Sequence, residues 1–227
     1  MSVITVQNLE KVYNETVVPV RAVDGISFTI EQGEFTAIVG PSGSGKTTLL
    51  NLIGGLDNPT SGKIEIDGID ISSLSENKLT DFRMNHIGFV FQAYNLIPVL
   101  TAQENVEFIM HLQGKTKKER LERSQKLLES VGLGDRLNSR PGKLSGGQQQ
   151  RVAVARALAS KPKFILADEP TANLDSKSTE TLLDIMEKLN KEENITFVFS
   201  THDSRVMKKA RRIITVEDGK IVKDEKH

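Results

Sequence analysis

The stretch "GPSGSGKTT", residues 40–48, places three glycines and two serines around one lysine and two threonines. It follows the apolar run "FTAIV" and leads into "LLNLIG", so we expect a strand before it and a helix after it. Glycines let the chain wrap with its N–H groups pointing inward, where they and the helix N-terminus hold phosphate oxygens. Lys46 should reach the β- and γ-phosphates of a nucleotide, and the Thr47 hydroxyl should coordinate Mg²⁺.

The expected phosphate cradle comprises Gly40, Ser42, Gly43, Ser44, Gly45, Lys46, Thr47 and Thr48. A glycine-rich turn without a ligand is the alternative, and the flanking strand and helix disfavour it.

Two carboxylates, Asp168 and Glu169, directly follow the apolar run "FILA". In an open parallel sheet the ligand lies beyond the carboxyl ends of the strands, so Asp168 should hold Mg²⁺, through water. Glu169 is placed to accept a proton from a water that attacks the γ-phosphate. The motif "DEP" alone fits an acidic turn equally well, and the upstream phosphate cradle favours the catalytic interpretation.

Two further polar residues follow apolar strands: Gln92 after "IGFVF" and His202 after "ITFVFST". The Gln92 amide is a candidate for contact with the metal or the attacking water. A lone histidine after a strand is most often a turn residue. His202 is a candidate site residue only because the phosphate cradle and the two carboxylates occur in the same chain.

The stretch "LSGGQQQR", residues 144–151, contains no carboxylate, histidine or cysteine that could run a reaction. Ser145 should cap a helix, and together with Gly146 and Gly147 it would form a second anion site at a helix N-terminus. One triphosphate does not need two such cradles from one chain. A capped helix start without a ligand therefore remains the alternative at this stage.

Strands and helices that position these residues alternate along the chain, which favours an α/β fold with a mainly parallel sheet. The first ~70 residues are strand-rich and predict an antiparallel β subdomain. We expect one domain over residues 1–227, with a helical insertion over residues 92–143. The expected strands are "ITVQNL", "ISFTI", "FTAIVG", "KIEI", "IGFVF", "KFILAD", "ITFVFS", "RIITV" and "KIV", and the clearest helices span residues 46–54, 102–112, 117–131, 146–160 and 177–192.

The composition argues against several classes of function. Thirty basic and thirty acidic side chains cancel, so we expect no nucleic-acid partner. The sequence has no cysteine, which excludes a disulfide framework and a thiolate metal site. We find no secretory signal and no apolar run near the ~18 residues of a membrane span, so we expect a chain that reaches a membrane only through another protein.

The order of these motifs resembles that of an ATP-binding cassette (ABC) ATPase, and the resemblance covers essentially the whole chain. "GPSGSGKTT", Gln92, "LSGGQ", "FILADE", "NLD" with Asp175, and His202 are similar to the Walker A, Q-loop, signature, Walker B, D-loop and switch histidine of that family. In finer detail, "GFVFQAYNLIPVLTAQENV" and "ILADEPTANLDS" resemble the ATPase subunits of lipoprotein-releasing and macrolide-efflux transporters.

The resemblance implies an ATP- and Mg²⁺-dependent ATPase that closes as a head-to-tail homodimer. The signature residues, Ser145 to Gln148, would then contact the γ-phosphate of a partner's ATP. His202 and Gln92 would sense the γ-phosphate, and Asp175 would belong to the nucleotide-binding residues. Tyr13 matches the aromatic that stacks on adenine; an aromatic packed in the sheet is the alternative.

We therefore expect the ATP-hydrolysing subunit of a membrane ABC transporter, lying on the cytoplasmic face of the membrane and docked on integral-membrane permease subunits. An ABC ATPase that drives a non-transport mechanical or sensing complex is the alternative, because the catalytic parts are shared. The apolar residues around Pro98, in "NLIPVL", are expected to form a docking patch, unless they pack as a small core of the insertion.

Overall fold

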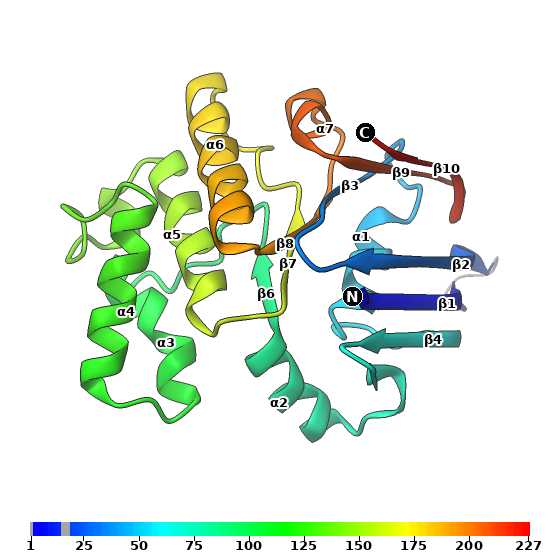
Figure 1. Cartoon of the computed structure of the whole chain (residues 1–227), viewed down its shortest axis with the longest axis horizontal. Helices are drawn as coiled ribbons and strands as arrows, with labels where there is room; N and C mark the ends of the chain where they lie inside the picture. Colours follow the sequence, from blue (N-terminus) through cyan, green and yellow to red (C-terminus); the bar gives the residue numbers. More distant parts are fainter. Residues whose placement is uncertain (1, 15–18) are drawn as a thin grey trace.

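The computed structural model describes residues 2–14 and 19–227, which form two β-sheets with helices on both sides of the larger sheet (Figure 1). The strands are β1 (Ser2–Tyr13), β2 (Val20–Glu31), β3 (Phe35–Val39), β4 (Ser61–Ile66), β5 (Ile69–Asp70), β6 (Ile87–Val90), β7 (Phe164–Asp168), β8 (Thr196–Ser200), β9 (Arg212–Glu217) and β10 (Lys220–Lys226). The α-helices are α1 (Lys46–Ile53), α2 (Glu76–His86), α3 (Ala102–Leu112), α4 (Lys117–Ser130), α5 (Gly146–Ala159), α6 (Ser176–Glu193) and α7 (Ser204–Lys209). Short 3-10 helices cover Ile71–Ser73 and Pro141–Lys143.

The six-stranded sheet has the order β10-β9-β3-β8-β7-β6. All neighbours from β9 to β6 are parallel, and β10 is added at the edge as an antiparallel strand. Because the strands β3, β6, β7 and β8 run in one direction, the segments that leave their carboxyl ends emerge at the same edge of the sheet. These segments carry the phosphate cradle, Gln92, Glu169 and His202.

The smaller sheet has the order β2-β1-β4-β5 and is antiparallel throughout. Its apolar side chains form one core cluster with those of α1 and one face of the larger sheet. Leu49, Leu52 and Ile53 of α1 are almost completely buried in this cluster. The helix that follows the phosphate cradle is therefore held between the two sheets.

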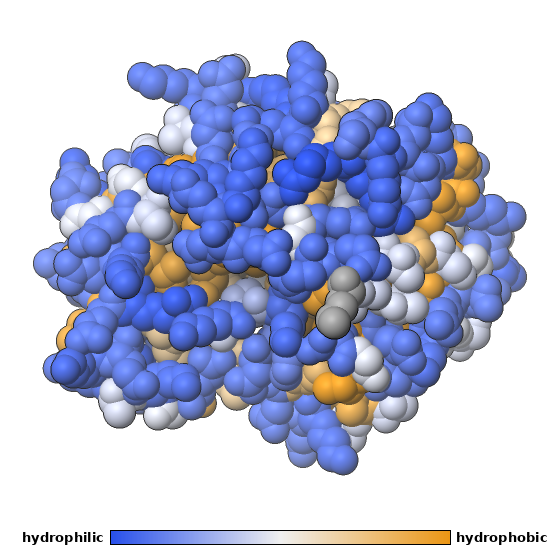
Figure 2. Space-filling model, viewed as in Figure 1, coloured by the Kyte–Doolittle hydropathy of each residue, from blue (hydrophilic) through white to orange (hydrophobic). Residues whose placement is uncertain are grey.

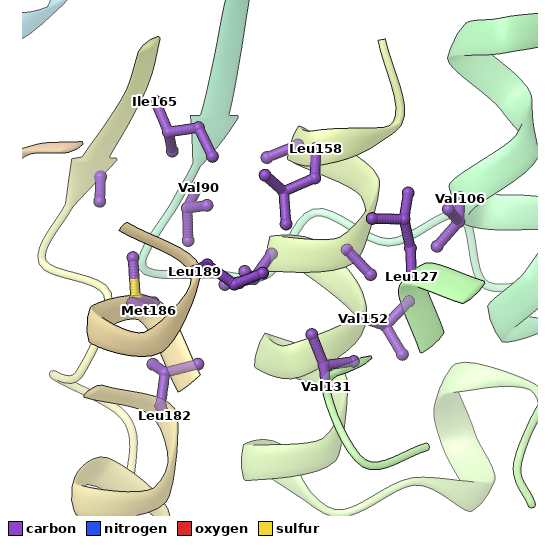
Figure 3. Close-up of a cluster of buried hydrophobic side chains, with 14 of the residues drawn as sticks. Val90, Val106, Leu127, Val131, Val152, Leu158, Ile165, Leu182, Met186 and Leu189 are labelled. Atoms are coloured by element: carbon purple, nitrogen blue, oxygen red, sulfur yellow. The ribbon is translucent and has the colours of Figure 1, made fainter. Parts of the chain in front are cut away.

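The opposite face of the larger sheet is covered by α5 and α6, and α3 and α4 pack on the outer side of α5 (Figure 1). Apolar side chains of these four helices form a second core cluster with the sheet (Figure 3). Helix α5 lies within this cluster: Val152 faces Val131 and Leu127 from the segment of α4, and Leu158 lies near Val90 of β6. Burial of this many apolar side chains on one helix fixes its axis against the sheet. Residues at the N-terminus of α5 therefore have a defined place.

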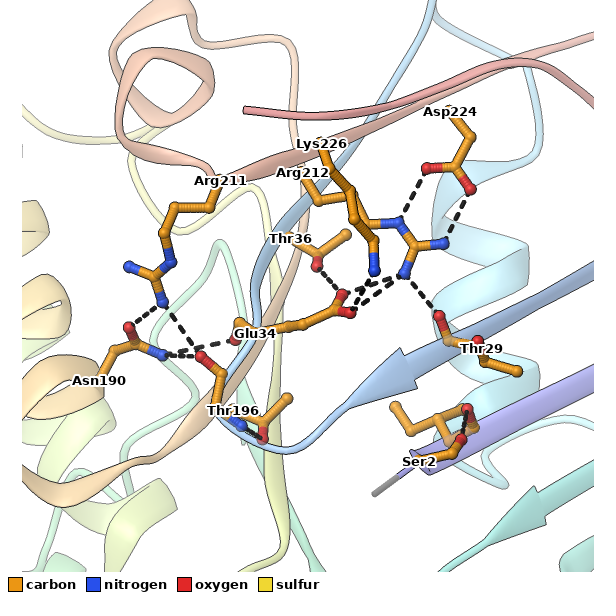
Figure 4. A network of polar contacts seen from close by, with 12 residues as sticks. Ser2, Thr29, Glu34, Thr36, Asn190, Thr196, Arg211, Arg212, Asp224 and Lys226 are labelled. Atoms are coloured by element: carbon orange, nitrogen blue, oxygen red, sulfur yellow. Dashed lines mark hydrogen bonds and ion pairs between the residues drawn. The ribbon is translucent and has the colours of Figure 1, made fainter.

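A network of charged groups fastens the amino end of β3 to β9 and to the edge strand β10 (Figure 4). Arg212 of β9 contacts Glu34 (3.0 Å) and Asp224 of β10 (2.8 Å). Burial would raise the pKa of Glu34, but hydrogen bonds from Arg212 and Thr36 outweigh it and lower that pKa. The network thus holds β3, which leads into the phosphate cradle, in register with β9 and β10.

The predicted parallel sheet and N-terminal antiparallel sheet are confirmed, and all nine predicted strands are present. The five predicted helices begin and end within one residue of their expected positions. Among the described residues, one strand and two α-helices were not predicted, besides the two short 3-10 helices: β5, with two residues, α7, with six, and α2. The sequence of α2 has only a weak apolar stripe, and in the structure only Leu79 and Phe82 of this helix are buried. Helices α3 and α4 lie between residues 102 and 130; the limits of the insertion as a subdomain stay a prediction.

The face of the molecule seen in Figure 2 is covered mostly by hydrophilic residues, with apolar ones in small separate areas. Within residues 2–14 and 19–227, no helix has the length and apolar character needed to cross a bilayer.

Candidate functional site

Two glycines of the phosphate cradle lie where no side chain fits, and a third adopts a backbone conformation that favours glycine. Gly45 caps α1 at φ 98°, and a Cβ atom there would lie 2.0 Å from the Ala22 carbonyl oxygen. A Cβ on Gly40 would lie 2.0 Å from the Val216 carbonyl oxygen. At Gly43, by contrast, φ is 79° and the space around a Cβ is open. The first two glycines therefore allow close backbone packing, and the third allows the left-handed turn.

The cradle contains polar groups that suit an anion. The Lys46 ammonium donates hydrogen bonds to the carbonyls of Gly40 (2.9 Å) and Pro41 (2.8 Å), so it lies across the loop. Ser44 is buried, and its hydroxyl has no hydrogen-bond partner among the described residues. A buried hydroxyl without a partner is costly unless a ligand satisfies it. The residues present thus fit a bound phosphate chain.

Thr47 and Asp168, which are far apart in sequence, meet at the carboxyl edge of the sheet. The Thr47 hydroxyl donates to Oδ1 of Asp168 over 3.2 Å. Hydroxyl and carboxylate oxygens are the ligands that Mg²⁺ prefers, and Mg²⁺ usually takes its other ligands from water and substrate phosphates. In the part of the chain that the structure describes, no group of three or more acidic, histidine or cysteine side chains could hold a metal by itself. The pair fits a Mg²⁺ ion that phosphates also ligate.

Glu169 and His202 are brought into direct contact at the same edge. Nδ1 of His202 lies 2.7 Å from Oε1 of Glu169, and the Thr201 hydroxyl donates to Oε2 over 3.4 Å. Glu169 has φ 44°, a left-handed conformation that residues other than glycine rarely adopt and that is concentrated at functional sites. Its N–H donates to the Ser200 carbonyl over 2.8 Å, which holds this conformation against β8. Glu169 is thus held in one orientation by contacts with His202, Thr201 and Ser200.

Asp203 organises the turn that carries His202. Its carboxylate caps α7 by accepting a hydrogen bond from the Arg205 N–H, and it also accepts from the Thr171 hydroxyl (2.8 Å). The Arg205 side chain, 2.7 Å away, is the main cause that lowers the pKa of Asp203 to about 2. The ionised carboxylate therefore ties the segment after Glu169 to the segment after His202.

We expect Asp203→Asn to destabilise the fold by about 1–2 kcal/mol at neutral pH, because the shift of the Asp203 pKa from 3.8 to about 2 corresponds to roughly 2.5 kcal/mol, which solvent screening of this partly exposed pair reduces. The folded-state pKa is lower than the unfolded one, so this stabilisation is present above pH ~4 and is lost as the pH falls toward about 2. Urea unfolding of both proteins between pH 7 and pH 3 measures it. A difference that stays constant over this range would show that the Asp203 charge does not contribute.

Gln92 lies at the same edge of the sheet, two residues beyond the end of β6, and is exposed. Its backbone carbonyl accepts a hydrogen bond from the Asn173 side chain over 3.0 Å. The segment after β6 is therefore tied to the segment after β7, and the Gln92 side chain remains accessible to a ligand.

The predicted helix cap at Ser145 is confirmed. The Ser145 hydroxyl accepts from the Gln148 N–H, and the Gln148 side chain accepts from the Ser145 N–H (2.8 Å), which completes a capping box. A Cβ on Gly146 would lie 2.8 Å from the Tyr94 hydroxyl, and one on Gly147 would lie 2.7 Å from the Ser178 hydroxyl. A side chain at either position would therefore force the neighbouring Tyr94 or Ser178 side chain to shift.

Helix α5, which begins at this cap, belongs to the core on the opposite side of the large sheet from α1 (Figure 1). The N-terminus of α5 therefore lies apart from the phosphate cradle of the same chain, although both are at the carboxyl edge of the sheet. Asp175 caps the neighbouring helix α6: its carboxylate accepts from the N–H (2.9 Å) and the hydroxyl (2.7 Å) of Ser178.

Tyr13 lies at the end of β1, and its ring is held by two neighbours. Its hydroxyl donates to Oδ2 of Asp57 over 2.8 Å, and the Lys11 ammonium lies 4.9 Å from the ring centroid. Lys11 also pairs with Oδ1 of Asp57 at 2.6 Å. Stacking of Tyr13 on an adenine stays a prediction.

Sequence reasoning missed several residues that organise the site: Asn173, Thr171, Asp203, Gln150, Tyr94 and Arg156. Asp203, followed by a short polar helix, carries the signal of a helix cap and could have been found. The others act through contacts between segments far apart in sequence, for which a single sequence has no signal.

Comparison with known proteins agrees with this geometry. Residues 23–172 match the family described as "ABC transporter". An uncharacterized ABC transporter ATP-binding protein of Thermotoga maritima is 52% identical over 93% of this chain and 90% of its own length. The macrolide export ATP-binding/permease protein MacB of Rhodopirellula baltica is 50% identical over 88% of this chain, which spans only 30% of that protein.

A solved dimeric structure of the ATP-binding cassette MJ0796, in a post-hydrolysis state bound to ADP and Pi, superimposes with a TM-score of 0.90. The two chains are 44% identical, and the match covers 98% of each.

Proposed function

Because this chain belongs to the ABC transporter family, we propose that it is the ATP-hydrolysing subunit of a membrane transport complex. The observation that supports this most strongly is the meeting of Lys46, Thr47, Asp168, Glu169 and His202 at one edge of the parallel sheet. The reaction is attack of water on the γ-phosphate of ATP, with ADP and phosphate as products. The geometry supports the following residue roles.

The phosphate cradle would bind the triphosphate of ATP. Lys46 would turn from the Gly40 and Pro41 carbonyls toward the β- and γ-phosphates. Thr47 and Asp168 would hold Mg²⁺, which when bound neutralises charge on the phosphate oxygens. Glu169 would accept the proton of the attacking water, and His202, bonded to Glu169, would contact the γ-phosphate. Gln92 would contact the metal or the water. Tyr13 would stack on the adenine.

We propose a head-to-tail homodimer in which Ser145, Gly146 and Gly147 of one chain contact the ATP of the other. The separation of α5 from the phosphate cradle supports this, because a capped helix N-terminus is an anion site that its own chain's nucleotide does not use. Asp175, close to this surface through Ser178, would lie at the same dimer interface.

The membrane partner would be an integral-membrane permease that docks on the segment 96–100, so that this chain lies on the cytoplasmic face of the membrane. Two residues of that segment, Val99 and Leu96, were both expected in one apolar docking patch, but they differ in exposure. Val99 is 71% exposed, whereas Leu96 packs against the core that α3 to α6 form with the sheet. The docking surface would therefore involve Val99, and Leu96 would support it from below.

We expect Val99→Glu to abolish copurification with the membrane partner while ATP hydrolysis by the isolated chain and its free energy of unfolding stay nearly unchanged, because an exposed substitution costs at most about 0.5 kcal/mol. Val222→Glu, at an apolar residue of β10 that is 54% exposed, is the matched control and should leave copurification intact.

Purification of the complex from its native membrane measures both. Retention of the partner by Val99→Glu would place docking elsewhere, and a partner without transport activity in vesicles would favour a mechanical or sensing complex.

A further inference from the structure

Helix α5 holds the segment after β6 by its backbone carbonyls. Gln150, which is fully buried, donates from Nε2 to the carbonyls of Phe91 (3.3 Å) and Pro170 (2.8 Å). One and a half turns later, the Arg156 guanidinium donates to the carbonyls of Tyr94 (2.9 Å) and Asn95. Two side chains of one helix thus fix both ends of the segment that contains Gln92.

This segment has a backbone that needs such support. Tyr94 and Asn95 are consecutive residues with φ 56° and 51°, in the left-handed region that costs free energy for residues with a side chain. Arg156 is half-buried, and burial lowers the pKa of its guanidinium. The rigid planar fork of a guanidinium holds two adjacent carbonyls in one fixed geometry, whereas a lysine ammonium at this position would lie on a flexible stem and fix them less firmly.

The same segment also contacts the surface that would meet a partner chain. The Tyr94 hydroxyl donates to the Asn173 carbonyl over 3.4 Å, and the Asn173 side chain donates to the Gln92 carbonyl over 3.0 Å. The Tyr94 hydroxyl also lies against Gly146, at the start of α5. Residues 91–95 are therefore connected to the N-terminus of α5 at both ends.

We propose that Arg156, with Gln150 and Tyr94, is a positioning residue that makes Gln92 and the Ser145–Gly147 turn move as one body. This inference rests on the proposed head-to-tail dimer. In that dimer Gln92 serves the ATP of its own chain and Ser145 serves the ATP of the partner. A rigid connection between them couples the two ATP sites through each chain, because displacement of either end is transmitted to the other.

The test uses Arg156→Lys, with Arg123→Lys as the matched control. Arg123, on α4, is also a half-buried arginine whose guanidinium donates to two adjacent backbone carbonyls, those of Leu158 (2.6 Å) and Ala159 (2.8 Å), which lie at the C-terminal end of α5, away from the Ser145–Gly147 turn. Both substitutions keep the charge and lose the fork. Each is introduced into the full chain carrying Glu169→Gln, and ATP-driven dimerisation and MgADP affinity are measured.

Arg156→Lys should raise the ATP concentration for half-maximal dimerisation by roughly tenfold, within the range of typical coupling free energies, and change MgADP affinity less than about twofold. Arg123→Lys should change neither quantity. Equal effects of the two variants on dimerisation, or none from Arg156→Lys, would overturn the proposal.

Tyr94→Phe, which removes only a hydroxyl, should shift dimerisation in the same direction by a smaller factor, and it replaces Arg156→Lys if that variant does not fold. If the chain carrying Glu169→Gln alone fails to dimerise with ATP, the proposed dimer itself is wrong and this inference falls with it. If that chain dimerises and both Arg156→Lys and Tyr94→Phe behave like it, only the inference is wrong.

Discussion

Glu169→Gln should lower kcat for ATP hydrolysis by ~10²–10⁴-fold while MgATP still binds, because an amide cannot accept the proton of the attacking water. The substitution preserves the shape of the side chain, and the amide oxygen can still accept the hydrogen bond that His202 gives to Glu169 over 2.7 Å. The left-handed backbone conformation at position 169 is equally costly for glutamate and for glutamine. With hydrolysis stopped, the ATP-bound dimer should accumulate. Phosphate release at saturating ATP, equilibrium nucleotide binding and size-exclusion chromatography measure the three effects.

Lys46→Ala is the control for binding, since it removes the ammonium that lies across the phosphate cradle. It should weaken nucleotide affinity itself, so that no dimer accumulates at ATP concentrations that saturate Glu169→Gln. Near-normal hydrolysis by Glu169→Gln would remove Glu169 from the role of general base. Loss of nucleotide binding in that variant would instead indicate that Glu169 contributes to the binding of ATP itself.

Mixed dimers of two inactive variants should recover ATP-dependent closure, which neither variant shows alone. One chain carries Lys46→Ala, which damages the phosphate cradle, and the other carries Ser145→Arg, which damages the capped turn at the start of α5. If each site combines Lys46 of one chain with Ser145 of the other, both changes fall in one composite site. The second site then keeps an intact cradle and an intact turn. Crosslinking across the interface after mixing, with and without ATP, measures closure.

Each variant by itself is the control, because both sites of each homodimer carry a lesion. Mixing should restore crosslinking only when both chains and ATP are present. If Ser145 instead served the nucleotide of its own chain, the mixed dimer would carry one lesion in each site, and no mixing ratio or ATP concentration would restore closure.

The elements and the local turns could be predicted because they depend on neighbours in the sequence. The cradle of residues 40–48 follows from glycines between an apolar strand and a helix, and the Ser145 cap follows from a serine three residues ahead of a glutamine. Nine strands and five helices followed from apolar periodicity. Helix α2 was missed because only two of its residues, Leu79 and Phe82, are buried, so its sequence carries little of the apolar periodicity that identified the other helices.

Residue types and their spacing identified which residues could carry the chemistry: an anion-binding loop, carboxylates after a strand, and a second helix cap with no reactive group. Which of these residues meet depends on the tertiary structure. The pairing of Glu169 with His202, the left-handed conformation of Glu169 and the hold of Arg156 on residues 94 and 95 depend on strand order and on helices packed from distant segments. It also decided that Ser145 and the cradle lie on opposite sides of the sheet, because burial of apolar side chains on both faces, a property of the whole chain, assigns each helix to its face.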